Sequence, residues 1–295
     1  MSPSSLADIY NRHGKDFARC GEYALAVQNY NEAVELNPNL AEAYNNRGTA
    51  YFRIKQYEQA IIDYDEAIAL NPTLAEAYNG RGTAYLYVKQ YEQAIADFSK
   101  IIELKPDFVG AYYGRGFIYK TLKQYAQAID DFDKVIELNP NFAAAYINRG
   151  LAYKHLKQYE SAIRDFDKVT ELKPNFAAAY YNRGNAYFYR KQYTQALQDY
   201  NKAIQLNPNF AAAYINRGIT YNDGLNQYER AIQDYDEAIR LNPNYANAYN
   251  NRAVSHHCLK QYEQALADYD KAVELDPNFT RAKKNRAACL QALGR

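Results

Sequence analysis

The chain has 295 residues, 48% of them hydrophobic, and a formal net charge of +1 at pH 7. The near-neutral charge argues against a bulk attraction to nucleic acid or to an anionic membrane surface. No stretch of 18 or more residues is apolar, and the sequence starts without a basic segment followed by an apolar one. We therefore expect neither a transmembrane helix nor a signal peptide. Cys20, Cys258 and Cys289 are few and scattered, which favours reduced thiols and a cytoplasmic location.

Prolines recur at a fixed spacing along almost the whole chain. The interval between them is 34 residues, apart from one interval of 35, and only Pro3 lies outside the series. The series is Pro38, Pro72, Pro106, Pro140, Pro174, Pro208, Pro243 and Pro277. Such a period predicts one supersecondary unit that is copied and stacked on its neighbours.

Each unit has the pattern of two helices. In the unit that starts at Ala41, which we number as position 1, Tyr44, Gly48 and Tyr51 share one helix face. A second stripe of the same kind follows over residues 57–68, after the short polar connection Lys55-Gln56. We name the two helices A and B. The proline ends helix B, because the residue before a proline avoids helical geometry.

Three further positions recur with the prolines. Position 33 carries helix N-cap residue types, so we expect the next helix to begin there. These residues are Asn39, Thr73, Asp107, Asn141, Asn175, Asn209, Asn244 and Asn278. Glycine at position 8, as in Gly48, and alanine at position 20, as in Ala60, indicate a close crossing of helices A and B. A glycine inside a helix costs about 1 kcal/mol, which close packing would offset.

This combination resembles the tetratricopeptide repeat. The matching pattern is Tyr44-x-x-Arg47-Gly48-x-x-Tyr51, then Ala60-x-x-x-Tyr64, then Pro72. The resemblance implies an all-α fold, an α-solenoid that forms a right-handed superhelix of antiparallel helix pairs, with helix A lining the concave groove. We predict an N-terminal tail (1–6), eight units (7–40, 41–74, 75–108, 109–142, 143–176, 177–210, 211–245 and 246–279) and a C-terminal capping helix (280–295).

Arginine at position 7 departs from the family, which usually has leucine there. Position 23 carries aspartate in the same units, and the first unit breaks both positions at once with His13 and Asn29. We expect structural ion pairs between neighbouring helices, although a basic strip for an anionic ligand is the alternative. The residues are Arg47, Arg81, Arg115, Arg149, Arg183, Arg217 and Arg252, with Asp63, Asp97, Asp131, Asp165, Asp199, Asp234 and Asp268.

The 35-residue unit contains an insertion at Asp223-Gly224, near the end of its helix A. It predicts either a longer turn or a local widening of the groove.

Asparagine recurs at position 6, which should face the groove. We call this set the asparagine ladder: Asn46, Asn148, Asn182, Asn216 and Asn251. It resembles the asparagines with which superhelical repeat proteins grip extended peptides, because an amide can pair with any peptide backbone. The alternative is that these asparagines have no binding role and are shared because the repeats arose by duplication.

Other groove positions carry apolar and basic side chains. They are Tyr113, Phe117, Lys120, Ile147, Leu151, Lys154, Tyr181, Phe188 and Tyr189. An exposed apolar strip usually marks a binding site, although these side chains could instead pack on each other between A helices. They favour a protein or peptide ligand with apolar anchors and some acidic character.

No catalytic or phosphate-binding motif is present. His256, His257 and Cys258 adjoin in sequence, but successive helical residues point about 100° apart and cannot converge on one metal. We therefore expect no cofactor, no metal and no enzymatic activity. The sequence favours a non-enzymatic protein–protein interaction scaffold. A self-assembling array, forming a homo-oligomer through its end repeats, is the alternative, and a sugar- or nucleic-acid-binding surface is less favoured.

Overall fold

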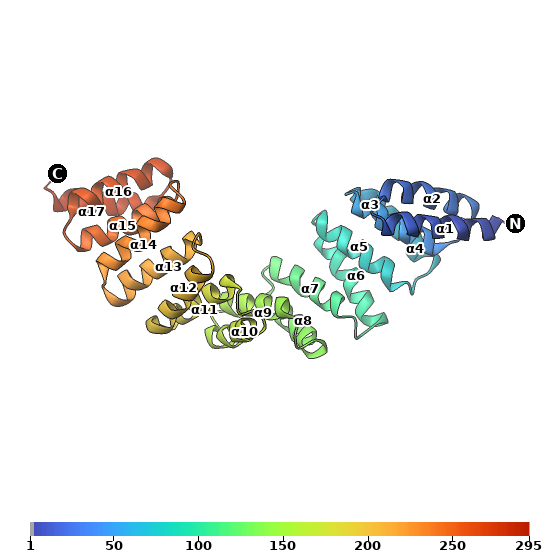
Figure 1. The fold of residues 1–295 in the computed structure, drawn as a ribbon, viewed down its shortest axis with the longest axis horizontal. Helices are drawn as coiled ribbons and strands as arrows, with labels where there is room; N and C mark the ends of the chain where they lie inside the picture. Colours follow the sequence, from blue (N-terminus) through green and yellow to red (C-terminus); the bar gives the residue numbers. More distant parts are fainter. Residues whose placement is uncertain (1–2, 295) are drawn as a thin grey trace. The chain divides into compact units, whose positions relative to one another are not determined.

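The computed structural model describes residues 3–294, which form helices joined by short turns, and contains no strand in that range (Figure 1). The A helices are α1 (Pro3–Arg19), α3 (Ala41–Arg53), α5 (Ala75–Tyr87), α7 (Val109–Thr121), α9 (Ala143–His155), α11 (Ala177–Tyr189), α13 (Ala211–Ile219), α15 (Ala246–Cys258) and the final α17 (Thr280–Ala292). The B helices are α2 (Tyr23–Leu36), α4 (Tyr57–Leu70), α6 (Tyr91–Leu104), α8 (Tyr125–Leu138), α10 (Tyr159–Leu172), α12 (Tyr193–Leu206), α14 (Tyr228–Leu241) and α16 (Tyr262–Leu275). The all-α solenoid of helix pairs is thus confirmed.

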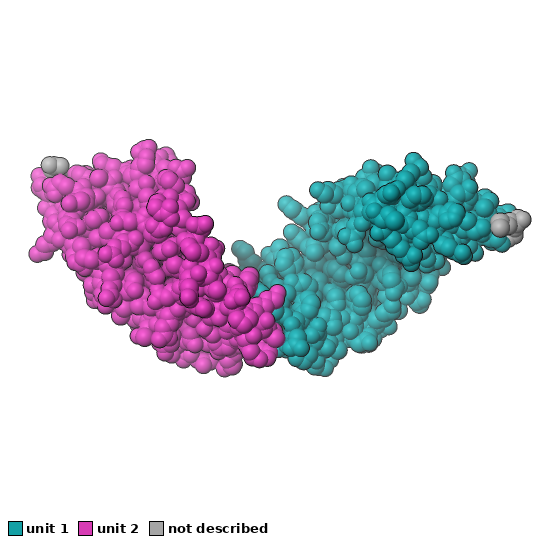
Figure 2. All heavy atoms as spheres, viewed as in Figure 1, with its two compact units in different colours: residues 1–148 teal, residues 149–295 magenta. Residues whose placement is uncertain are grey.

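The chain divides into two compact units, residues 1–148 and 149–295 (Figure 2). The division falls inside α9. Within each unit, A helices pack on the B helix that follows, as α3 does on α4, and B helices pack on the next A helix, as α4 does on α5. The core has no separate centre, because each pair is covered by its neighbours along the stack.

Small residues let the paired helices approach closely. A Cβ added to Gly48 would lie 3.1 Å from the carbonyl oxygen of Ala60 and 3.1 Å from the Tyr64 ring. Ala60 is fully buried. The position-8 glycine and the position-20 alanine therefore meet at the crossing, and the aromatic residue at position 24 packs over the glycine.

The helix ends differ from the sequence-based expectation in two ways. Position 33 is not the N-cap: α3 begins after Leu40, and no side chain caps it. The asparagine before the proline forms the local side-chain hydrogen bond here, because Asn37 Oδ1 accepts from the backbone N–H of Asn39 at 3.2 Å. This local Asx turn occupies the residue predicted to cap. Helix α1 begins at Pro3, so residues 3–6 of the expected tail are helical, and residues 1–2 lie outside the described residues; proline suits the first helical position.

The turn from helix A to helix B uses a left-handed residue. Lysine occupies it in most repeats, as in Lys55 (φ 64°) and Lys157 (φ 59°), whereas Gly21 and Asn226 occupy it in the first and seventh. A left-handed lysine is uncommon. The sequence predicted a polar turn but gave no sign of this conformation.

The extra residue of the seventh repeat is absorbed as a π-helical turn, η1 (Thr220–Gly224), which continues α13. Gly224 packs on Tyr193, since a Cβ there would meet the ring at 2.8 Å. Asn222 is buried and accepts a hydrogen bond of 2.7 Å from Ser255 of α15. The insertion is therefore absorbed in the helix and not in a longer turn, and Asn222 of η1 is hydrogen-bonded to the next A helix, α15.

Candidate functional site

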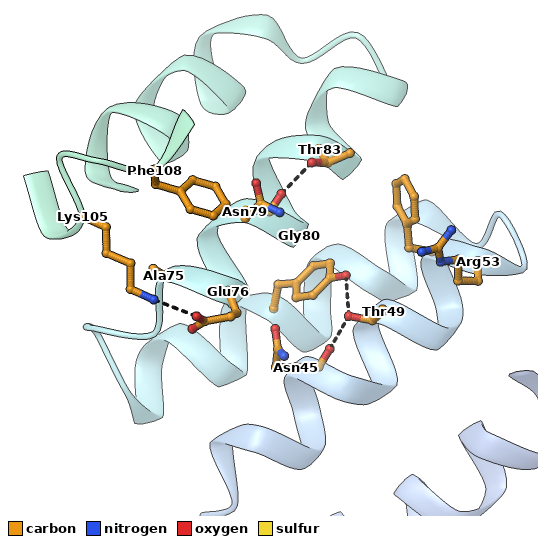
Figure 3. Close-up of a pocket in the computed structure, with 12 residues that line it drawn as sticks. Asn45, Thr49, Arg53, Ala75, Glu76, Asn79, Gly80, Thr83, Lys105 and Phe108 are labelled. Atoms are coloured by element: carbon orange, nitrogen blue, oxygen red, sulfur yellow. Dashed lines mark hydrogen bonds and ion pairs between the residues drawn. The ribbon is translucent and has the colours of Figure 1, made fainter. Parts of the chain in front are cut away.

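The N-terminal unit contains a pocket between α3 and α5, which we call the Gly80 pocket (Figure 3). Its volume is about 360 Å³. Lys105 and Phe108 lie at one end and Arg53 at the other (Figure 3). Lys105 forms an ion pair of 2.8 Å with Glu76. Asn45 lines the pocket, and its Oδ1 is buried without a hydrogen-bond partner.

Gly80 makes this pocket possible. A Cβ on Gly80 would lie 2.3 Å from Tyr64 Cζ, so the ring occupies the space that a side chain at position 6 would need. The Tyr64 hydroxyl shares a hydrogen bond of 3.2 Å with Thr49 and lines the pocket. The gap in the asparagine ladder at this repeat therefore has a steric cause.

Gly80→Asn, which would restore the usual residue, is expected to destabilise the chain by about 1–3 kcal/mol because the Tyr64 ring must move. Urea unfolding followed by circular dichroism measures this. The matched control is Gly110→Asn, since Gly110 is exposed and its nearest neighbour is the exposed ring of Phe108. Equal stability of the two variants would contradict the steric account.

Each position-7 arginine lies between B helices and outside the pockets described here. Arg183 donates to Asp199 through Nε at 2.8 Å and NH2 at 2.6 Å, and through NH1 to Asp167 of the preceding repeat at 2.7 Å. The guanidinium also lies over the Tyr180 ring at 5.4 Å. The same bidentate contact to position 23 joins Arg47 to Asp63, Arg81 to Asp97, Arg115 to Asp131, Arg149 to Asp165, Arg217 to Asp234 and Arg252 to Asp268.

Burial shifts the pKa of both the aspartate and the arginine in these pairs. Desolvation raises the pKa of Asp199, and the hydrogen bonds from Arg183 act in the opposite direction. For Arg115, the hydrogen bonds that it donates to Asp131 are the main cause of a raised pKa. These guanidinium groups are thus engaged within the stack, which leaves little capacity for a basic strip at position 7.

The ladder amides are hydrogen-bonded within the protein. In the N-terminal unit, Asn148 donates to the carbonyl of Ala144 at 2.8 Å and to the Tyr113 hydroxyl at 3.1 Å, and it accepts from Lys120 at 2.5 Å. Asn46 donates to Asn11 at 3.0 Å. Asn148 is buried, and burial lowers the pKa of Lys120.

In the C-terminal unit, Asn216 donates to the Tyr181 hydroxyl at 3.1 Å and to Asn185 at 2.7 Å. Asn182 donates to the Ala178 carbonyl at 2.8 Å. Asn251 accepts from Asn250 at 3.2 Å. A bound backbone would have to exchange with these internal partners.

Two adjoining pockets lie along the A helices of the C-terminal unit. The first, the Lys154 pocket, has a volume of about 580 Å³. It is lined by Lys154, His155, Lys157, Tyr159, Tyr181, Asn185, Phe188, Tyr189, Tyr200, Asn216 and Ile219. The second, the Arg281 pocket, has a volume of about 370 Å³. It is lined by Phe188, Tyr189, Ile215, Ile219, Asn222, Asp223, Tyr235, Tyr245, Asn247, Asn251, Val254 and Arg281.

Six predicted groove residues therefore line these two pockets. The first contains Lys154, Tyr181, Phe188, Tyr189 and Asn216, and the second contains Phe188, Tyr189 and Asn251. Asn46 lines a further pocket in the N-terminal unit with Lys15 and Arg53. Phe117, Ile147 and Leu151 are partly buried on their helices.

Aromatic packing accounts for part of the apolar strip. Tyr181 lies 4.8 Å from Phe210, and Tyr113 lies 5.1 Å from Phe142, measured between ring centroids. Burial raises the pKa of both tyrosines. Tyr189, in contrast, is 58% exposed and stacks on Tyr159 at 5.2 Å. Among the predicted apolar groove residues, some rings thus pack between helices and others, such as Tyr189, remain exposed.

Several lining residues escaped the sequence-based prediction. Asn185 and Asn222 are buried polar residues, and Arg281 comes from the final helix. Asn185 sits at position 9, which otherwise is mostly apolar or threonine, and this exception was the one available signal.

Residues 3–294 contain no cluster of three or more His, Cys, Asp or Glu side chains able to hold a metal ion. His256 Nδ1 instead lies 2.6 Å from Gln261 Oε1. Of the helices described, none is long and apolar enough to cross a bilayer.

Repeated helix pairs with pockets along their A helices define an α-solenoid. The Tetratricopeptide repeat profile matches residues 41–74, 75–108, 109–142, 143–176, 177–210, 199–233 and 246–279, and a TPR repeat profile matches 14–55 and 225–259. The chain therefore belongs to the tetratricopeptide repeat family, as the sequence pattern predicted.

Solved structures share this architecture. YrrB, described as a TPR protein with an unusual peptide-binding site, is 29% identical with a TM-score of 0.58, over 62% of this chain and 95% of its own. The MamA protein is 28% identical with a TM-score of 0.55, over 57% of this chain and 92% of its own. A tetratricopeptide repeat protein from Parabacteroides merdae is 22% identical with a TM-score of 0.60, over 85% and 99% of the two chains, which bears on the fold alone. No curated protein matches the chain.

Proposed function

We propose that this chain is a non-enzymatic protein-interaction scaffold that holds a peptide segment or helix of a partner along its A helices. One observation carries the proposal: the Lys154 and Arg281 pockets share Phe188, Tyr189 and Ile219 and so adjoin in a single trough. A trough that combines an apolar floor with a few polar groups suits a chain-like ligand.

Asparagine side chains supply the polar contacts in this proposal. Asn216 lines the first pocket and Asn251 the second. The Asn216 amide bonds to Tyr181 and Asn185 and the Asn251 amide to Asn250, so a peptide backbone would take the place of side-chain partners and not of backbone ones. The peptide-binding site described for YrrB, a family member of 29% identity, supports the same class of ligand. The free cysteines suit a reducing compartment such as the cytoplasm.

A random dodecapeptide display library, selected on the immobilised full chain, tests this function. We expect enrichment on the wild type and a loss of at least about tenfold in retained binders on the Phe188→Ala, Tyr189→Ala variant, since interface aromatics dominate binding.

Ile62→Ala is the control, because Ile62 is 60% exposed but lies on α4, a B helix. It should retain binders like the wild type. If no peptide is enriched, or if the double variant retains the same peptides, the trough is not a peptide site.

A further inference from the structure

The charged groups of the Lys154 pocket are all basic or potentially basic. Lys154, His155 and Lys157 line it, and no Asp or Glu does. Close by in sequence, Glu160 is ion-paired with Arg190, and Asp223 lines the adjoining Arg281 pocket rather than this one. The lining of the pocket therefore holds basic side chains and no acidic one.

Lys154 is the unusual member of this group. Its side chain is half-buried, and its Nζ donates to a neutral acceptor, Asn182 Oδ1, at 3.4 Å. Burial lowers the pKa of Lys154, and no carboxylate acts against this effect. The pocket lysines of the N-terminal unit differ, because Lys105 is paired with Glu76 and Lys15 with Glu42. A partly desolvated cation without a counter-charge favours an anionic ligand.

The floor beside these lysines is aromatic. Tyr159 and Tyr189 stack with an interplanar angle of 11°, and Phe188 meets Tyr189 edge-on at 5.7 Å. The exposed Tyr189 leaves a flat apolar surface next to the cationic groups. Such a surface takes an aromatic or large aliphatic side chain.

We infer that the Lys154 pocket binds an acidic peptide segment, whose carboxylates pair with Lys154 and Lys157 and whose neighbouring aromatic or aliphatic side chain packs on Tyr159 and Tyr189. This inference rests on the proposed function and names the ligand class for one part of the trough. It separates this pocket from the Arg281 pocket, which carries both Asp223 and Arg281 and has no excess of either sign.

The peptides enriched on the full chain test the inference. Their Asp and Glu content should exceed that of the unselected library. The enriched peptides are then labelled with fluorescein, and their affinities are measured by anisotropy. They are compared with isosteres in which every Asp is replaced by Asn and every Glu by Gln. We expect the isosteres to bind at least about tenfold more weakly, because a desolvated charge pair loses one partner.

Lys154→Gln should lower the affinity for the acidic peptides by about tenfold and leave the affinity for the isosteres unchanged. Lys89→Gln is the control for losing one lysine charge outside the pocket, since Lys89 is a turn residue that lines none of the pockets described. Enriched peptides without an acidic excess, or equal binding of the isosteres, would overturn the inference and leave the proposed function intact. Absence of any enriched peptide would overturn both.

Discussion

Asp199→Ala is expected to lower the free energy of unfolding by about 3–5 kcal/mol, because it leaves the Arg183 guanidinium partly buried without its bidentate partner. The Asp199 side chain is 6% exposed and that of Arg183 is 18% exposed. Neither group can recover full hydration without a movement of α11 against α12. Urea unfolding followed by far-ultraviolet circular dichroism gives the total effect, and amide hydrogen exchange shows whether the loss is concentrated in these helices.

The same arginine provides the control. Asp167 also accepts from Arg183, at 2.7 Å, but its side chain is 51% exposed. Asp167→Ala should therefore cost less than about 1 kcal/mol. If the two alanine variants lose equal stability, burial of the Arg183–Asp199 contact does not explain the loss.

A double replacement separates the net contribution of the Arg183–Asp199 pair to the free energy of unfolding from the penalty for removing only one partner. Burial raises the pKa of Asp199, so the carboxylate is costly to desolvate. Arg183→Met combined with Asp199→Leu should therefore recover at least half of the stability that Asp199→Ala loses, because a buried ion pair and an apolar pair are often equivalent. A double variant as unstable as the single one would instead show that the pair itself stabilises the stack.

The co-occurrence of arginine and aspartate was informative because the repeats act as an internal comparison. His13 and Asn29 depart from the pattern together, and this joint departure predicts a contact between positions 7 and 23. The second contact, from Arg183 to Asp167 of the preceding repeat, was not predictable. It depends on how one pair stacks on the next, and the period alone carries no such information.

Local turn geometry was harder to predict than the helices. The recurring proline located the end of helix B, but the N-cap assignment of residues such as Asn39 was wrong, since Asn37 already accepts from its amide. Lys157 gave no sign of its left-handed conformation, because lysine has no preference for it. In both cases several local geometries suit the same residues, and packing selects one.

The sequence could predict which repeat positions face the groove, but it could not predict which hydrogen bonds their side chains form. Asn216 lies along the trough, yet its amide is held by Tyr181 and Asn185. The partner of such an amide depends on residues of the preceding repeat, here at its positions 5 and 9. The π-helical turn at Thr220–Gly224 is a similar case, because an added residue can be absorbed by a turn or by a helix.

Phe166→Ala is expected to cost about 3–5 kcal/mol, the usual range for removing a buried aromatic ring from a core. Phe166 is fully buried and packs with Ala162, Ile163 and Leu151. A Cβ on Gly150 would lie 3.0 Å from its ring, so the ring fills the space that the position-8 glycine leaves open. The cavity would lie between α9 and α10, and hydrogen exchange should show the loss of protection there first.

Phe166→Tyr tests whether this effect is one of volume alone. Tyrosine stands at the same position in other repeats, where the hydroxyl of Tyr200 has Asn185 as its partner at 2.8 Å. The residue equivalent to Asn185 in the repeat of Phe166 is Leu151, which cannot hydrogen-bond. Phe166→Tyr should therefore cost about 1–3 kcal/mol for an unpaired buried hydroxyl, and adding Leu151→Asn should restore part of it. If Phe166→Tyr is neutral, or if Leu151→Asn lowers stability further, the hydroxyl does not depend on position 9.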